Sequence, residues 1–194
     1  MMENKTFWNE AARWGLGIGA LLALSFILEE QMTSSGRLGL YTLMVFEWLA
    51  AAALHFWLLL RFTRSRAARY SVEEGFTFGQ GYGCVLGVSL PAGVILGVVQ
   101  TVYLHLIIGY ANYIERSIAS MSAMIARSGS SIPRGFESLF SQTFEQLRSA
   151  PTPSVLESVL GGVTSTLFFG VFFGLIVAAI TARPPRPFDN NATE

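Results

Sequence analysis

Four long apolar segments divide this sequence, at residues 11–28, 38–60, 81–110 and 155–181. A helix needs about 20 consecutive, mostly apolar residues to cross the hydrocarbon core of a bilayer. Each segment reaches or approaches that length, and Pro91 is the one proline that lies inside any of them. The pattern predicts an all-α fold, a four-span transmembrane helix bundle in a single membrane domain, residues 1–182. A flexible cytoplasmic tail, residues 183–194, is expected to follow.

The segment between the third and fourth spans, residues 111–153, carries apolar residues at helical spacing. Two stripes recur in it every three or four residues: Ile114, Ile118, Met121 and Ile125, then Phe136, Leu139, Phe140, Phe144 and Leu147. Gly129 and Pro133 mark the turn between them. We therefore expect an amphipathic helical hairpin on the outer side of the membrane. Its apolar faces would pack on each other, on the membrane surface or on a partner.

Positive charge is distributed unevenly between the two sides that four crossings define. One side holds the N-terminus, the loop after the second span and the tail, with Lys5, Arg13, Arg61, Arg64, Arg66, Arg69, Arg183 and Arg186. The loop after the first span holds only Arg37. Because short cytoplasmic flanks are enriched in Lys and Arg, we expect both termini to lie in the cytoplasm.

Composition then removes several classes of function. Charged residues make up 13% of the chain, about half of the roughly 25% that soluble domains carry. The net charge is zero, so the lipid bilayer, and not nucleic acid, is the expected partner. Cys84 is the single cysteine, and His55 and His105 lie far apart, which leaves no disulfide or cysteine metal cluster. We expect no cofactor, no metal and no enzyme activity.

Residues 75–97 read GFTFGQGYGCVLGVSLPAGVILG and contain seven glycines. A dinucleotide fingerprint needs GxGxxG after a strand, but Cys84 occupies the third position. Spacings of four residues are instead typical of membrane helices whose backbones approach closely. The candidate packing residues are Gly79, Gly83, Gly87, Gly93 and Gly97 in the third span, Gly15 and Gly19 in the first, and Gly170 and Gly174 in the fourth. They predict a tight bundle, and a homo-oligomer face stays open as an alternative.

Glu47 is the outstanding polar residue of the four spans. At about 1.5 Å of rise per residue, it lies about 3 Å from the middle of the membrane, where an ionisable side chain is a candidate for function. Polar residues of similar depth complete a candidate intramembrane site of Glu47, Gln100, Ser25, Ser165 and Thr166. Three interpretations stay open: a hydrogen bond that fixes helix register, a proton- or ion-coupled site, and a contact with another membrane protein.

His55 follows Glu47 by eight residues on the same predicted helix. That separation is about 80° around the helix and about 12 Å along it, so the two side chains cannot both face one small ligand directly. We interpret His55 and Cys84 as packing residues.

Two short patterns predict where the third and fourth spans begin. In a capping box, a Ser or Thr side chain and a Glu or Gln three residues later bond each other's backbone N–H groups. Thr77 with Gln80 fits this pattern, and so does Ser154 with Glu157. Glu157 therefore has a structural role before any catalytic one.

Several of these segments resemble a known family. From Phe7 to about Ala182, the chain is similar to a family of small four-helix bacterial membrane proteins catalogued as a domain of unknown function, family 4199. The resemblance rests on FWNEAARWGLGIG, EEGFTFGQGYG, SLPAGVILGVVQTVY and the amphipathic loop before the last span. HLIIGYANYIER departs from it, because it lacks a proline that often follows the third helix. The resemblance implies a multi-pass location in a bacterial plasma (inner) membrane and brings no catalytic residues.

The sequence alone favours a non-enzymatic accessory or scaffold protein. Packing faces and an amphipathic segment are present, and no catalytic constellation is recognisable. The alternative is a small transporter or channel that uses the polar layer around Glu47. A cavity reaching Glu47 would favour the transporter, and a fully packed core would favour the scaffold.

Overall fold

The computed structural model describes residues 2–35, 37–128 and 136–185 of the chain. Its elements are α1 (Met2–Ser34), α2 (Leu38–Ala67), α3 (Phe78–Thr101), the π-helix η1 (Val102–Ile108), α4 (Tyr110–Ser128), α5 (Phe136–Ser149) and α6 (Val155–Thr181). The described residues form helices and no strand, which confirms the predicted all-α fold.

Four helices are long and apolar enough to cross a membrane: Thr6–Ser34, Gly39–Ala67, Phe78–Ile108 and Val155–Thr181. They confirm the four predicted spans and identify a membrane protein. The first two helices extend beyond their apolar segments, because residues such as Glu30 and Arg64 continue the helical backbone past the hydrocarbon length.

Both predicted capping boxes are present. Thr77 Oγ1 accepts a hydrogen bond from the Gln80 backbone N–H at 3.2 Å, and Gln80 Oε1 accepts one from the Thr77 N–H at 2.7 Å. Ser154 and Glu157 make the same reciprocal pair. The starts of α3 and α6 are therefore fixed by local sequence, as predicted.

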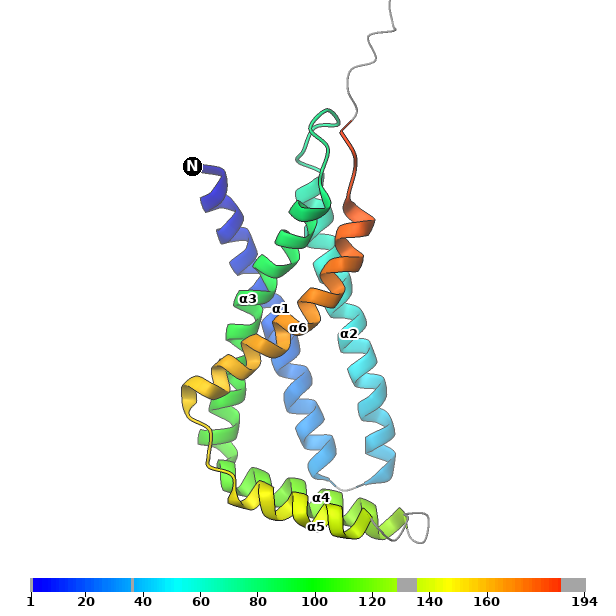
Figure 1. The fold of residues 1–194 in the computed structure, drawn as a ribbon, viewed down its shortest axis with the longest axis vertical. Coiled ribbons are helices and arrows are strands. Elements are labelled where there is room, and N and C mark those ends of the chain that lie inside the picture. Colours follow the sequence, from blue (N-terminus) through cyan, green and yellow to red (C-terminus); the bar gives the residue numbers. More distant parts are fainter. Residues whose placement is uncertain (1, 36, 129–135, 186–194) are drawn as a thin grey trace, which may run out of the picture.

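The helices are arranged as a bundle with one covered end. Figure 1 shows α1 and α2 side by side, α3 crossing α6, and α4 and α5 lying together across one end. The start of α1, the α2–α3 loop and the end of α6 lie toward the opposite end (Figure 1). We call these the hairpin end and the terminal end of the bundle.

The helix α4 is fixed to the hairpin end by polar and apolar contacts. Ile114 and Ile118 of the predicted stripe are buried. Ser120 Oγ donates to the Thr33 carbonyl of α1 at 2.6 Å and also hydrogen bonds the Tyr41 hydroxyl of α2. Part of the apolar face of α4 therefore packs against the helix bundle. The turn predicted at Gly129 and Pro133, and the side chain of Phe136, lie outside the described residues.

An ion pair between α4 and α5 makes their packing pH-dependent. Arg148 Nε donates to Glu115 Oε1 at 3.0 Å, and this hydrogen bond holds the pKa of the Glu115 carboxyl below its ordinary value. The contribution of the pair is full above the unfolded-state pKa of about 4.3 and is lost as pH falls through the lowered folded-state pKa.

We expect the distance distribution between spin labels on α4 and α5 to broaden when the pH is lowered from neutral to about 3. The effect is small, because exposed pairs contribute little. Glu115→Gln should broaden the distribution at neutral pH and remove the acid response. Equal distributions for the unsubstituted protein at both pH values would contradict the expectation.

The third span ends in a π-helix that the sequence pattern did not predict. Thr101 Oγ1 donates to the Gly97 carbonyl at 2.7 Å just before η1. His105 of η1 hydrogen bonds Ser158 of α6 at 3.1 Å, and Gly109 ends the element with a φ of 82°. A wider helical turn of this kind has no composition signature, and π-helical turns occur frequently at functional sites.

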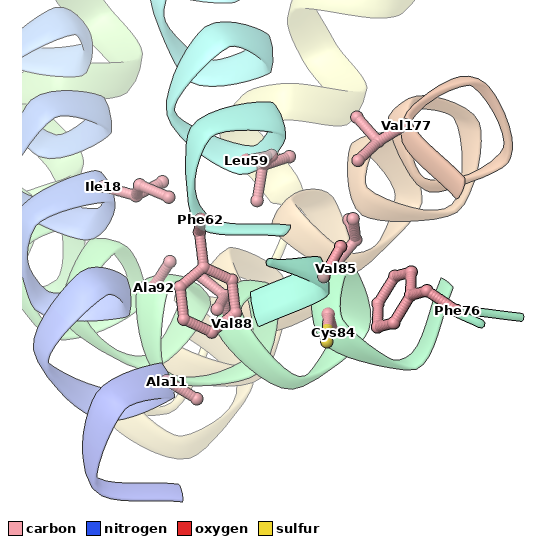
Figure 2. Packing of buried hydrophobic residues seen from close by; sticks show 11 residues of the cluster. Ala11, Ile18, Leu59, Phe62, Phe76, Cys84, Val85, Val88, Ala92 and Val177 are labelled. Atoms are coloured by element: carbon pink, nitrogen blue, oxygen red, sulfur yellow. The ribbon is translucent and has the colours of Figure 1, made fainter. Parts of the chain in front are cut away.

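The buried core fills the terminal end of the bundle. Figure 2 shows its side chains converging from α1, α2, the α2–α3 loop, α3 and α6: Ala11, Ile18, Leu59, Phe62, Phe76, Cys84, Val85, Val88, Ala92 and Val177. Cys84 is buried among them, which agrees with its interpretation as a packing residue. This half of the bundle is packed with apolar side chains.

Glycines bring α3 and α6 into backbone contact where they cross. A Cβ on Gly97 would lie 2.8 Å from the Val159 Cα, and a Cβ on Gly93 would lie 2.7 Å from the Val163 Cα. Gly162 lies directly opposite, and a Cβ there would come within 2.5 Å of the Gly97 backbone nitrogen. Gly162 was not predicted as a packing residue, because no Gly or Ala lies four residues before or after it.

The helix α1 packs on α3 through a second set of glycines. A Cβ on Gly15 would lie 2.5 Å from the Pro91 ring, and one on Gly19 would lie 2.7 Å from the Ala92 carbonyl oxygen. Gly87 lies under the Phe7 ring. The two candidate glycines of α6, Gly170 and Gly174, face Ser89 and Tyr82 of α3.

Gly79 and Gly83 differ from the prediction. A Cβ at either position would meet no described atom within 4 Å, so neither glycine packs against a neighbouring helix. Gly81 approaches α6 instead, with a Cβ position 3.1 Å from the Ala178 Cα. The reason is geometric: residues two apart on a helix point about 200° away from each other.

The chain after α6 contacts the α2–α3 loop as far as Pro185. The Arg183 N–H donates to the Phe76 carbonyl at 2.8 Å, and the Phe76 N–H donates back at 2.9 Å. The Arg183 guanidinium also donates to the Ala67 carbonyl. Gly75 has a φ of 66° and lies against Pro185. The tail predicted from residue 183 is therefore bound at its start, and residues 186–194 lie outside the described part.

The basic α2–α3 region forms specific pairs at the terminal end. Glu10 of α1 accepts from Arg66 at 3.2 Å and from Arg69 at 2.7 Å. Arg66 also lies over the Phe7 ring, 5.4 Å from its centroid. These arginines join α1 to α2 in addition to any role in topology.

Candidate functional site

A cavity of about 150 Å³ lies between α1, α2, α3 and α6, on the hairpin side of the core. Four residues of the predicted polar site line it: Ser25, Gln100, Ser165 and Thr166. They come from three different helices, so the fold brings together side chains that the sequence only placed at a similar depth. Ser165 is the most exposed of the four and lies at the edge of the packed region.

Glu47 lies one hydrogen bond behind the cavity wall. Ser25 Oγ donates to Glu47 Oε1 at 2.6 Å, which joins α1 to α2 in the middle of their spans. The second carboxyl oxygen, Oε2, is buried and makes no hydrogen bond to the described residues. Glu47 is therefore only half satisfied by the protein.

Two further polar side chains of the cavity have an unpaired atom. His55 is 3% exposed and Thr166 is 2% exposed, and neither His55 Nε2 nor Thr166 Oγ1 has a hydrogen-bond partner among the described residues. A buried, unpaired polar group costs about 1–3 kcal/mol. Both residues line the cavity.

His55 combines the predicted packing contact with a place in the cavity wall that the sequence did not indicate. Its ring does pack edge-on against Phe173, with centroids 5.4 Å apart. The separation of His55 from Glu47 still excludes a direct pair, but His55 lines the cavity together with Trp48, one α2 residue after Glu47.

Glu29 is a cavity residue that the sequence analysis missed. It lines the cavity from α1 and lies close enough to Glu47 for the two carboxyl groups to interact electrostatically. It was overlooked because it follows the apolar segment 11–28 and resembles a helix-end charge. The available signal was its spacing of four residues from Ser25, which places both on one helix face.

Comparison with known proteins adds a family. A family model described as "Protein of unknown function (DUF4199)" matches residues 13–183. The chain belongs to the DUF4199 family. This match confirms the resemblance drawn from the sequence and covers all the cavity residues named above. No curated protein and no solved structure matches the chain.

Aromatic side chains complete the cavity of this DUF4199 protein. Trp48 of α2 and Phe169 of α6 meet edge to face, with ring centroids 6.4 Å apart. Phe173 lies one turn beyond Phe169, at 6.1 Å, and Phe26 lines the cavity from α1. The described residues that line the cavity include Glu29 but no Lys or Arg.

The side chains that could bind a metal ion do not form a cluster among the described residues. Within residues 2–35, 37–128 and 136–185, no three His, Cys, Asp or Glu side chains gather at one place. The DUF4199 cavity is a mixed aromatic and polar site, with one carboxyl at its wall and a second directly behind it.

Proposed function

We propose that this DUF4199 protein is a small transporter that binds a small solute in the cavity and carries it across the membrane. The observation that carries the proposal is the polar lining of the cavity among four helices that are long and apolar enough to span a bilayer. Ionisable groups in such spans mark substrate or ion pathways.

The unequal filling of the bundle supports this proposal. Leu59 and Phe62 of α2, with Val88 and Ala92 of α3, close the cavity toward the terminal end. Three of the five unpaired buried polar atoms among the described residues, those of Glu47, His55 and Thr166, lie in or next to the cavity, and the other two belong to Arg66 and Ser89. The arrangement is that of a binding site with one closed side.

We also propose a location and an orientation. The protein would lie in a bacterial plasma membrane with both termini in the cytoplasm, so that α4 and α5 face outward. The support is the excess of Lys and Arg at the terminal end, together with the general enrichment of these residues in short cytoplasmic flanks.

An accessory or scaffold role, non-enzymatic like the first, is the second candidate. The observation that favours it is the amphipathic helix α5, on which Leu139 is 55% exposed. A second copy of the chain or another membrane protein would cover this face. The role ranks second because it assigns no purpose to the cavity.

Glu47→Gln is expected to reduce solute flux in proteoliposomes about tenfold or more, the effect of losing about 1.4 kcal/mol of interaction. Glutamine still accepts the hydrogen bond from Ser25, so the substitution removes the ionisable group and keeps the helix contact. Flux is measured across a panel of cationic, neutral and anionic solutes. Glu73→Gln is the control, because Glu73 lies exposed in the α2–α3 loop.

The outcomes separate the two candidates. Flux that is lost in Glu47→Gln and kept in Glu73→Gln supports the transporter. If no solute in the panel crosses the membrane with the unsubstituted protein, the transporter is rejected and the scaffold role takes its place.

A further inference from the structure

The geometry points to a chemical class for the ligand: we propose that the cavity binds a small alkylammonium ion that carries at least one N–H. This inference rests on the proposed binding role of the cavity and does not require transport. In this proposal the acidic groups attract the positive charge of the ligand, and the aromatic rings contact its alkyl groups. The unpaired acceptors receive hydrogen bonds from its N–H.

The charge around the cavity favours a cation. Glu29 lines it, Glu47 lies one hydrogen bond behind Ser25, and the two carboxyl groups interact with each other. Carboxyl groups at and behind the wall favour a cation, because opposite charges attract each other more strongly in a poorly solvated site than in water. No Lys or Arg stands among the described lining residues, so an anion would find no compensating charge.

The aromatic wall fits an alkylated ammonium. Rings within about 6 Å attract such cations through their negative faces, and aromatic cages bind methylated ammonium groups in this way. The Trp48 ring and the Phe169 and Phe173 rings form a continuous wall from α2 to α6, with centroid separations of 6.4 and 6.1 Å. Trp48 is 48% exposed, so its ring is not fully covered by other side chains.

Two unpaired hydrogen-bond acceptors are the reason that the proposed ligand carries an N–H. The neutral form of His55 can present Nε2 as an acceptor, and Thr166 Oγ1 accepts as well. Both atoms are buried without a partner in the described structure, and both residues line the cavity. An ammonium N–H supplies the donor that these atoms lack, whereas a fully methylated ammonium does not.

The volume of the cavity limits the size of the ligand. About 150 Å³ equals the volume of an engineered protein cavity that binds benzene. A tert-butylammonium ion is of comparable size. Bare divalent cations fit the lining less well, because they require six or more oxygen ligands and the described residues hold no cluster of three acidic, His or Cys groups.

Three probes of one shape test the proposal on the full-length protein in nanodiscs. Titration calorimetry compares tert-butylammonium with tert-butanol, which lacks the charge, and with tetramethylammonium, which lacks the N–H. We expect tert-butylammonium to bind at least about tenfold more tightly than tert-butanol, and tetramethylammonium to bind between the two.

Matched variants assign the contacts. Glu29→Gln should weaken tert-butylammonium binding about tenfold or more, and Glu73→Gln should leave it unchanged. Trp48→Leu should weaken it about fivefold, whereas Trp48→Phe should retain most of the affinity because it keeps an aromatic face. The Trp48 pair keeps the test valid even if Glu29→Gln fails to fold.

Equal affinity for tert-butylammonium and tert-butanol would overturn the proposal, and so would the absence of binding to any cation probe. Indifference to both Glu29→Gln and Trp48→Leu would also overturn it. Flux of a neutral or anionic solute without cation binding rejects the ligand class and leaves the transporter standing. Cation binding without flux of any solute supports the ligand class and rejects the transporter.

Discussion

Gly97→Ala is expected to lower the free energy of unfolding by about 1–3 kcal/mol, the usual cost of an extra methyl group in a well-packed contact. The new Cβ would lie 2.8 Å from the Val159 Cα, across the crossing of α3 and α6. The neighbouring atoms belong to the backbone of a helix, so they cannot turn aside as a flexible side chain would. Gly162 lies on the other side of the same contact and leaves no room for a compensating shift.

Unfolding in mixed detergent micelles, followed by circular dichroism, measures this effect. Gly83→Ala is the matched control, because a Cβ at Gly83 meets no described atom within 4 Å. Alanine is a better helix former than glycine by about 1 kcal/mol, so Gly83→Ala should be neutral or stabilising. Similar losses of stability in both variants would mean that the crossing of α3 and α6 is not the cause.

Thr166→Val is expected to raise the free energy of unfolding by about 1 kcal/mol or more. The two side chains have nearly the same shape, and the Thr166 hydroxyl is buried without a hydrogen-bond partner in the described structure. Valine removes this unpaired polar group and keeps the packing. Because Thr166 lines the cavity, the same substitution should weaken ligand binding while it stabilises the fold.

Thr181→Val is the control for this prediction. Thr181 is also buried in α6, but its Oγ1 donates to the Val177 carbonyl at 2.8 Å. The control removes a hydrogen bond that is made, so it should not stabilise the protein. A gain in thermal stability for Thr166→Val alone would support a role of the Thr166 hydroxyl in ligand binding. Equal changes in stability for both variants would contradict that role.

The fold was largely predictable because its signals are local. The apolar length of each span, and the capping residues Thr77 and Ser154, act within a few residues of the helices that they specify. The bridge between Phe76 and Arg183 was not predictable, because it joins backbone groups more than a hundred residues apart. For the same reason, nothing in the sequence indicated that Arg183, at the start of the predicted tail, is paired with Phe76.

The candidate site was predictable only in part. The membrane depth estimated from the sequence is similar for Ser25, Gln100 and Thr166, and the structure places all three around one cavity. Depth does not specify how each helix is rotated, which is why Glu29 was missed and why His55 was interpreted only as a packing residue. The same lack of rotational information led to the packing role for Gly79 and Gly83, whose positions face away from α6.

The bundle has a close-packed core toward its terminal end and a cavity on the hairpin side of that core. These two parts should differ in stiffness. Regions with few buried apolar contacts open at a lower free energy than a close-packed core. The close-packed side chains around Phe62 and Val88 therefore make the terminal end the stiffer part of the bundle. The α2 segment from Trp48 to His55 borders the cavity and is the more compliant part. We therefore expect the part of the bundle that holds the unpaired groups of Glu47, His55 and Thr166 to open at a lower free energy than the core.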